Sequence, residues 1–302
     1  MHISTREELV NYLNINIALS NFIDNVAINT ITTDLRKKLH NNYATGVLDY
    51  ISEFEKLISN SIEYGGMFFT ISEEGLITLA YVLGDYSTVD LSDAVDEIGM
   101  FAFAFNEHLE HFSCSSVKRI QKYAFIGSNI ADVESNNLEV IEKGAFRRCT
   151  HLSCLNFSNL IYIGEDGFTN SKVDSIRIEA PITLAARAFF RASIKSLILP
   201  SELYLEVLQR HQGYYLIDGV LIEAHVSQIK FILPEDNKIR LYYRKIPMKG
   251  KEEVRLKEEL YIKKPKCNAF PECDGCPNFE HISGLNNPVL EHLTTLHYRY
   301  FT

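Results

Sequence analysis

The 302-residue sequence predicts an α/β solenoid: an array of repeats with parallel strands on one face, preceded by helices and followed by a small β-rich module. Three observations predict this fold. Phenylalanine recurs at a nearly fixed period, a short apolar pattern typical of strands fills each interval, and the composition changes on both sides of the array. The predicted divisions are an N-terminal helical cap at 1–66, the solenoid at 67–234 and the C-terminal module at 235–302.

The first division has the pattern of helices. Ser4 and Thr5 are each followed by a glutamate three residues later, which gives two overlapping capping boxes for a helix that begins with REELVNYL. A second helix is expected to begin near Thr33 and Asp34. A third is expected over 45–64, where the apolar residues share one face.

The glycine pair at 65–66 is expected to end the third helix, and MFFTISEEGLITLAYVL after it predicts a β-hairpin that leads into the first repeat. Because an open solenoid end exposes its core, we interpret the helices as a cap. The alternative is a separate partner-binding domain.

The phenylalanines mark a repeat of 21 or 22 residues, a period typical of solenoids. They are Phe103, Phe125, Phe146, Phe168 and Phe189. An aliphatic residue stands five positions before each: Ile98, Ile120, Ile141, Ile163 and Leu184. A small residue directly precedes each: Ala102, Ala124, Ala145, Gly167 and Ala188. We expect Phe to fill the space between layers, on a short helical or 3₁₀ turn opposite the strands; the alternative is a chance spacing in an ordinary α/β domain.

A second pattern, apolar-x-x-apolar-x-apolar, lies between the phenylalanines. Its clearest copies are Leu152, Leu155, Phe157; Val173, Ile176, Ile178; and Ile194, Leu197, Leu199. Weaker copies are Leu109, Phe112, Cys114 and Ile130, Val133, Ser135, and Val89 with Leu91 opens the array. The period-two pair in each copy predicts a short strand with two inward side chains.

These motifs resemble a known family. IEKGAFRRCTHLSCLNF and SIKSLILP are similar to the BspA-like (Treponema-type) leucine-rich repeats, and YYLIDGVLIEAHVSQIKFILP is similar to the terminal unit of that family. The resemblance covers roughly residues 76–234. It implies a leucine-rich repeat solenoid that serves as a binding scaffold for unrelated partners. Many members are secreted or surface-attached, whereas this sequence shows no export signal, so adhesion is not the expected role.

The residues that flank each inward pair are expected to point outward along the strand face. The outward pairs are Thr88-Asp90, His111-Ser113, Asp132-Glu134, Cys154-Asn156, Ser175-Arg177 and Ser196-Ile198. Since solenoids use their strand-lined face for recognition, the candidate partner-binding residues are Asp90, His111, Asp132, Glu134, Asn156 and Arg177. The acidic bias favours a protein partner with basic groups. The alternative is a merely solvated sheet.

The C-terminal module begins with a basic stretch. Between Lys238 and Lys266 there are eleven Lys and Arg but four Glu, and KIRLYYRKIP and VRLKEELYIKK alternate as the two strands of a hairpin. Such a hairpin can hold nucleic acid by phosphate contact and base stacking. The candidate residues are Arg240, Tyr243, Arg244, Lys263, Lys264 and Lys266. The alternative is a solvated hairpin whose lysines protect an edge strand.

The tail after this hairpin holds a candidate zinc site. Cys267, Cys273, Cys276 and His281 offer three thiols and an imidazole, which can complete a tetrahedral site. Only the C-x2-C half has a common spacing, and AFPECDGCPNFEHIS also imitates the repeat. In that reading Cys276 is a structural cysteine like Cys149. Apart from a structural zinc, no cofactor is expected.

Composition and missing motifs narrow the function. The net charge of −9 argues against a whole-chain nucleic-acid or membrane binder. The N-terminus lacks the pattern of a signal peptide, and six cysteines are too few for a disulfide scaffold, which predicts a cytoplasmic protein. No phosphate loop, HExxH or nucleophile elbow occurs, so no catalytic residue is assigned.

We therefore predict non-enzymatic recognition of another macromolecule, most simply a protein. One specific version is an intracellular effector or a phage-borne inhibitor that docks on a host protein. The second hypothesis is nucleic-acid binding through the basic hairpin, with or without zinc. The pattern does not specify an oligomeric state.

Overall fold

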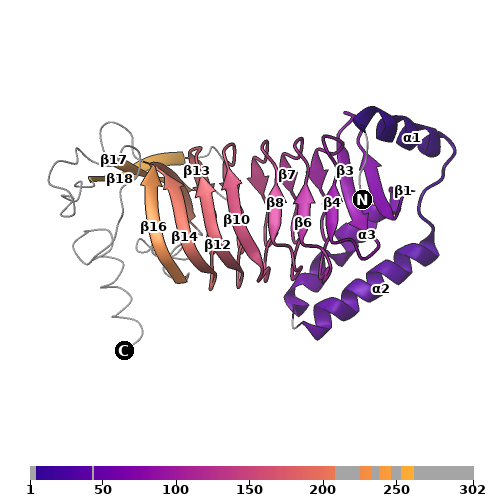
Figure 1. Cartoon of the computed structure of the whole chain (residues 1–302), viewed down its shortest axis with the longest axis horizontal. Coiled ribbons are helices and arrows are strands. Elements are labelled where there is room, and N and C mark those ends of the chain that lie inside the picture. Colours follow the sequence, from indigo (N-terminus) through magenta and orange to yellow (C-terminus); the bar gives the residue numbers. More distant parts are fainter. Residues whose placement is uncertain (1–4, 43, 208–224, 233–237, 246–252, 262–302) are drawn as a thin grey trace.

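The computed structural model describes residues 5–42, 44–207, 225–232, 238–245 and 253–261. It is an elongated array of coils with helices at one end (Figure 1). Four helical segments come first: α1 (Arg6–Ala18), α2 (Asn25–Asn41), the 3₁₀ helix η1 (Thr45–Tyr50) and α3 (Ile51–Ser59). The strands that follow belong to three sheets that run along the array.

The strand face consists of two parallel sheets. In spatial order the first contains β4 (Thr88–Asp90), β6 (His111–Ser113) and β8 (Asp132–Glu134). The second contains β10 (Leu152–Phe157), β12 (Lys172–Ile178), β14 (Ser193–Pro200) and β16 (His225–Ile232). Figure 1 shows these strands side by side along the array. The predicted parallel strands are therefore present, with one from each coil.

A third sheet forms a second wall, and the sequence predicted only its two hairpins, β2 with β3 and β17 with β18. Its spatial order is β1 (Ile62–Tyr64), β2 (Met67–Ile71), β3 (Ile77–Val82), β5 (Glu97–Ile98), β7 (Arg119–Ile120), β9 (Val140–Ile141), β11 (Tyr162–Ile163), β13 (Ile182–Leu184), β15 (Glu202–Val207), β17 (Lys238–Lys245) and β18 (Glu253–Tyr261). The aliphatic residues five positions before each Phe lie on this sheet. Ile98 pairs with Ile120, for example, and Ile120 pairs with Ile141.

The phenylalanines stack along the core as predicted. Successive rings from Phe103 to Phe189 lie 5.0, 5.2, 5.1 and 5.5 Å apart between centroids, and their planes are tilted by 19° at most. The amide of each Phe donates to the carbonyl of the residue that precedes the next Phe; the Phe125 bond to Ala145 is 2.9 Å long. A small residue at that position allows neighbouring coils to approach closely, which explains the Ala-Phe and Gly-Phe pairs.

The Phe segments are hydrogen-bonded turns in which an amide donates to the carbonyl three residues earlier, as Ala104 does to Phe101 at 3.0 Å; of the two predicted forms, the turn is present and a regular helix is not. The residue two positions before each Phe and the residue two positions after it both have positive φ. The pairs are Phe101 and Phe105, Tyr123 and Gly127, Gly144 and Arg148, Asp166 and Asn170, and Arg187 and Arg191. A left-handed residue on each side interrupts any helix, so the backbone turns sharply around the Phe.

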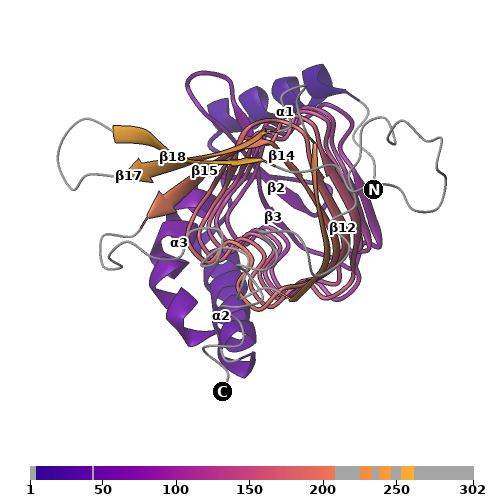
Figure 2. The ribbon, with the colours of Figure 1, turned by 90° about the vertical axis from the view of Figure 1, so that its left-hand side faces the viewer.

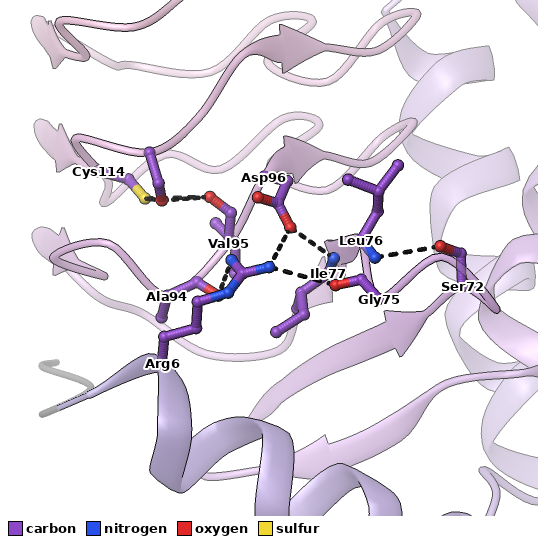
Figure 3. Close-up of polar contacts among 10 residues, drawn as sticks. Arg6, Ser72, Gly75, Leu76, Ile77, Ala94, Val95, Asp96 and Cys114 are labelled. Carbon is purple, nitrogen blue, oxygen red and sulfur yellow. Dashed lines mark hydrogen bonds and ion pairs between the residues drawn. The ribbon is translucent and has the colours of Figure 1, made fainter.

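The first helix covers the N-terminal end of the core. Thr5 accepts a hydrogen bond from the Glu8 amide and caps α1, so the second capping option is the one used. Leu9 and Leu13 of α1 are fully buried with the solenoid core. Figure 3 shows Arg6, at the start of α1, contacting the loops that precede β3 and β5.

The other helices pack beside the Phe turns. Phe54 of α3 contacts Tyr81 and Phe101 edge-on, and Leu35 and Leu39 of α2 are buried in the same cluster. Figure 2, which views the array along its length, shows α2 and α3 against the turns. The helical segment therefore covers both the end of the array and one flank of its first coils.

Two helix boundaries differ from the sequence prediction. α2 begins eight residues earlier than expected, at Asn25, because the Asp24 carboxylate accepts from the Ala27 amide and caps the helix there. The third helix ends at Ser59, and Ile62–Tyr64 is strand β1. The Gly65-Gly66 pair has φ of 60° and 79°, so it closes the hairpin of β1 and β2 and does not end a helix.

Candidate functional site

A hollow lies on the strand face where its two sheets meet. It has a volume of about 480 Å³, and residues of β4, β6, β8 and β10 line it. It includes four of the six predicted partner-binding residues: Asp90, Asp132, Glu134 and Asn156. The structure thus brings together residues that are up to 66 positions apart in the chain.

The regular coil stacking places these residues in rows. Asp90 pairs with Ser113, and Ser113 pairs with Glu134, so these three residues lie in register on successive strands. Between the outward residues, Val89, Phe112 and Val133 point into the core and are buried. This alternation of buried and accessible residues in each three-residue strand fixes the face on which the carboxylates lie.

The hollow is acidic. Asp90, Asp132 and Glu134 contribute carboxylates, and no Lys or Arg is among its lining residues. Asp90 accepts a hydrogen bond of 2.9 Å from the Ser92 amide, which holds that carboxylate at the edge of the strand. The remaining lining residues are mainly Ser, Asn and Cys, so the surface offers hydrogen-bonding groups beside the negative charge.

The other two predicted residues lie beside the hollow. The His111 imidazole has its Nδ1 4.0 Å from a carboxylate oxygen of Asp132, and its side chain is 55% exposed. Arg177 lies one strand beyond Asn156, with which it pairs in register. Its Nε donates to the Glu179 carboxylate at 2.7 Å, so this arginine offers little free positive charge to the face.

Sequence reasoning missed the loop residues that form one rim of the hollow. Ser92, Ser115 and Asn136 follow the strands and line it. Side chains in these loops connect successive coils: Ser115 Oγ donates to the Ser92 carbonyl at 3.0 Å, and Asn137 Nδ2 donates to the Ser115 carbonyl at 2.8 Å. The signal that could have found them is the recurrence of Ser or Asn two positions after β4, β6 and β8.

Two cysteines line the hollow: Cys114 is buried and Cys154 is exposed. Cys149, five residues earlier, is buried and donates to the Phe125 carbonyl at 3.0 Å. Burial raises the pKa of the Cys149 thiol to about 12. Because a thiol with such a pKa is not a nucleophile near neutral pH, Cys149 is a structural cysteine.

The alternative sites are only partly covered by the structure. Arg240, Tyr243 and Arg244 lie on β17, which pairs antiparallel with β18 and forms the predicted hairpin. Lys263, Lys264, Lys266 and the zinc candidates Cys267, Cys273, Cys276 and His281 lie outside the described residues. Within the described ranges, no cluster of three His, Cys, Asp or Glu could hold a metal ion. In the same ranges, no helix is both long and apolar enough to cross a membrane.

Strand β17 of the predicted hairpin pairs with β15 on one side and with β18 on the other. Arg240 lies beside Glu202 of β15 and opposite Glu259 of β18. Arg244 lies beside Glu206 of β15. These pairings define the backbone register of the hairpin within the third sheet.

The repeats of this chain are similar to those of known proteins. Residues 81–196 match the BspA type leucine rich repeat region in six copies. A leucine rich cell surface protein from Faecalibacterium prausnitzii A2-165 has a similar structure, with 15% identity, a TM-score of 0.39, and coverage of 60% of this chain and 57% of that one. The pneumococcal vaccine antigen PcpA is similar with 17% identity, a TM-score of 0.35, and coverage of 55% of this chain and 48% of that one. No curated protein matches the chain significantly.

Proposed function

Because residues 81–196 are a BspA-type leucine-rich repeat segment, which supports a protein-interaction module, we propose that this chain binds a protein partner through the acidic hollow. One observation carries the proposal: coil stacking gathers Asp90, Asp132 and Glu134 into one concavity that no Lys or Arg lines. A partner that presents lysine or arginine side chains matches this charge. Leucine-rich repeat folds are typically non-enzymatic, and the proposed activity is binding alone.

The rigid strand face suits this role. On each strand, the outward side chains flank residues that are buried in the core. Because the strands are held in this way, their side chains lose little conformational freedom when a partner binds. In the specific version that we propose, the chain is a cytoplasmic effector or phage-borne inhibitor that docks on a host protein. The acidic hollow supports such a version because complementary charge accelerates encounter and selects the partner.

The test is a tagged pull-down from nuclease-treated lysate of the native host, read by mass spectrometry. The hollow variant combines Asp90→Asn, Asp132→Asn and Glu134→Gln. The control variant combines Glu73→Gln, Glu74→Gln and Asp93→Asn, which removes the same charge from exposed residues that do not line the hollow. We expect one protein to be captured by the wild type and the control and lost by the hollow variant.

Two results would contradict the proposal. Capture of the same protein by the hollow variant would place the binding surface elsewhere. Capture that does not weaken with salt would also contradict it, because exposed charges are screened over about 10 Å at 0.1 M ionic strength. A separate Arg177→Gln variant is expected to retain the partner, since its guanidinium is already bound to Glu179.

Nucleic-acid binding through the hairpin is the second candidate, supported by the pairing of β17 with β18. In that case the untreated lysate yields nucleic acid, and neutral substitution of Lys263, Lys264 and Lys266 abolishes it. The net charge of −9 makes this the weaker proposal.

A further inference from the structure

The Phe turns present a second surface that changes character along the array. Around each Phe, the residues two before, one after and two after lie outside the core cluster that contains the Phe rings. In the first two turns these are Phe101, Ala104, Phe105, Tyr123 and Ile126, together with Gly127, and the five with side chains are buried against the helices. From Phe146 onward the corresponding residues are Gly144, Arg147, Arg148, Asp166, Thr169, Asn170, Arg187, Phe190 and Arg191. The helical cover thus gives way to an arginine-rich surface.

Four arginines and one aromatic residue define this surface, which we call the arginine flank: Arg147, Arg148, Arg187, Phe190 and Arg191. Arg147 and Phe190 occupy equivalent positions two coils apart, as do Arg148 and Arg191. The Phe rings of these coils are spaced by 5.1 and 5.5 Å, so equivalent residues lie about 10 Å apart along the array. Backbone bonds maintain this register, with the Arg148 amide donating to Thr169 and the Asn170 amide to Phe190.

The positive charge of the flank is mostly uncompensated. Arg187 forms an ion pair of 3.1 Å with Asp166. For Arg147, Arg148 and Arg191, the described part of the chain provides no carboxylate at ion-pair distance.

The geometry also holds the guanidinium groups in place. Those of Arg187 and Arg191 lie 4.7 and 5.0 Å from the Phe190 ring centroid, at cation–π distance. Arg148 donates to the Asn42 carbonyl, which follows α2. Arginines that are already ordered lose less rotamer freedom when they bind, and their planar forks match carboxylates.

We propose that the arginine flank binds an acidic segment of a partner protein that lies along the array and places carboxylates about 10 Å apart. The observation that carries this is the absence of a carboxylate at ion-pair distance from Arg147, Arg148 and Arg191 among the described residues, together with the ordered guanidinium groups around Phe190. The chain as a whole carries −9, so general attraction cannot recruit an acidic segment and binding depends on this local surface. The flank is separate from the acidic hollow, which the strands form.

The experiment uses the full chain and a fluorescein-labelled peptide of about twelve residues with Glu at every third position and Gly elsewhere. In a polyproline II conformation, which has three residues per turn and a rise of about 3.1 Å per residue, these carboxylates lie on one face about 9 Å apart. The flank variant combines Arg147→Gln and Arg191→Gln. The control combines Lys172→Gln and Lys195→Gln, two exposed strand-side residues, and removes the same charge. Fluorescence anisotropy measures binding, and circular dichroism melts confirm that each variant is folded.

We expect the wild type and the lysine control to bind the peptide and the flank variant to bind at least about tenfold more weakly, with no binding of the matched Gln peptide. The Asp90/Asp132/Glu134 variant is expected to bind the peptide as well as the wild type, which separates this inference from the proposed function. Equal binding by the flank variant, or no binding by the wild type, would overturn the proposal. Tighter binding of single-stranded DNA of similar length would overturn it too, and would assign the flank to nucleic acid.

Discussion

The Arg6 guanidinium lies 2.7 Å from a carboxylate oxygen of Asp96, ninety residues away in the chain. The same oxygen accepts the Ile77 amide at 2.8 Å, and Arg6 also donates to the carbonyls of Gly75 and Ala94 (Figure 3). One ion pair therefore connects the start of α1 with the strands β3 and β5 at the end of the array. It holds in place the helix that covers the first core layer.

Loss of this ion pair is expected to destabilise the fold. Arg6→Gln should lower the free energy of unfolding by about 1–2 kcal/mol, an amount reduced for partial solvent exposure. Arg36→Gln is the control, because its pair with Glu55 is more exposed and should contribute at most about 0.5 kcal/mol. Urea denaturation measures both values. Equal effects of the two substitutions would show that the Arg6 contact does not hold α1.

The central ring of the Phe stack should be the most sensitive core position. Phe146 is fully buried between Phe125 and Phe168, so Phe146→Ala removes contacts on both faces. The expected loss is about 3–5 kcal/mol, and Phe146→Leu, which leaves a smaller cavity, should cost less. Chemical denaturation would measure this. A melting temperature unchanged by Phe146→Ala would contradict the proposed stacking.

Two glycines give opposite expectations for the same substitution. Gly144 has φ of 63°, and a Cβ there would lie 2.3 Å from the Tyr123 ring. Gly144→Ala should therefore cost about 1–3 kcal/mol. In η1, a Cβ at Gly46 meets nothing within 4 Å, so Gly46→Ala should be neutral or stabilising. Thermal melts of the two variants measure this difference. Equal shifts in melting temperature would refute the left-handed turn at Gly144.

Two buried tyrosines predict a loss of stability in alkali. Burial raises the pKa of Tyr81 and of Tyr123 to about 12. The unfolded chain titrates near pH 10, so it loses protons first, and stability that is complete below about pH 10 is lost as the pH rises towards 12. Each tyrosine should account for about 1 kcal/mol at about pH 11.

The double variant Tyr81→Phe/Tyr123→Phe isolates this effect. Its free energy of unfolding should fall less than that of the wild type between about pH 9 and about pH 11, as measured by urea denaturation at each pH. Tyrosinate absorbance in the folded protein provides a second readout. Parallel pH profiles for wild type and variant would show that these phenols are accessible to solvent.

The fold could be predicted largely because one coil cannot bury its own Phe. The 21- or 22-residue spacing and the inward pairs therefore located the core from Phe103 to Phe189. The second wall could not be predicted in this way. Its strands are as short as Glu97–Ile98, and two residues carry no alternation pattern. The predicted start of α2 was wrong because an apolar residue, Val26, lies on the exposed side of its first turn, where it is 74% exposed. It therefore interrupts the apolar stripe by which a helix is recognised in a sequence.

The candidate site was predictable to the extent that strand alternation decides which side chains point outward. That reasoning placed Asp90, Asp132, Glu134 and Asn156 on one face, and the structure gathers them in one hollow. It could not show that Arg177 is paired with Glu179, since this depends on rotamers. The arginine flank was also missed, because the left-handed turns that direct Arg148 and Arg191 have no signal in residue type.

The change from apolar to charged residues after Phe146 has an evolutionary consequence. The helices bury the apolar turn residues of the first coils. Duplication of a coil after Phe146 adds a ring to the stack and leaves every helix contact intact, whereas duplication before it leaves an aromatic residue such as Phe105 exposed. Natural variation in length can therefore accumulate towards the C-terminal end, in steps of one coil, while the helical end is inherited unchanged.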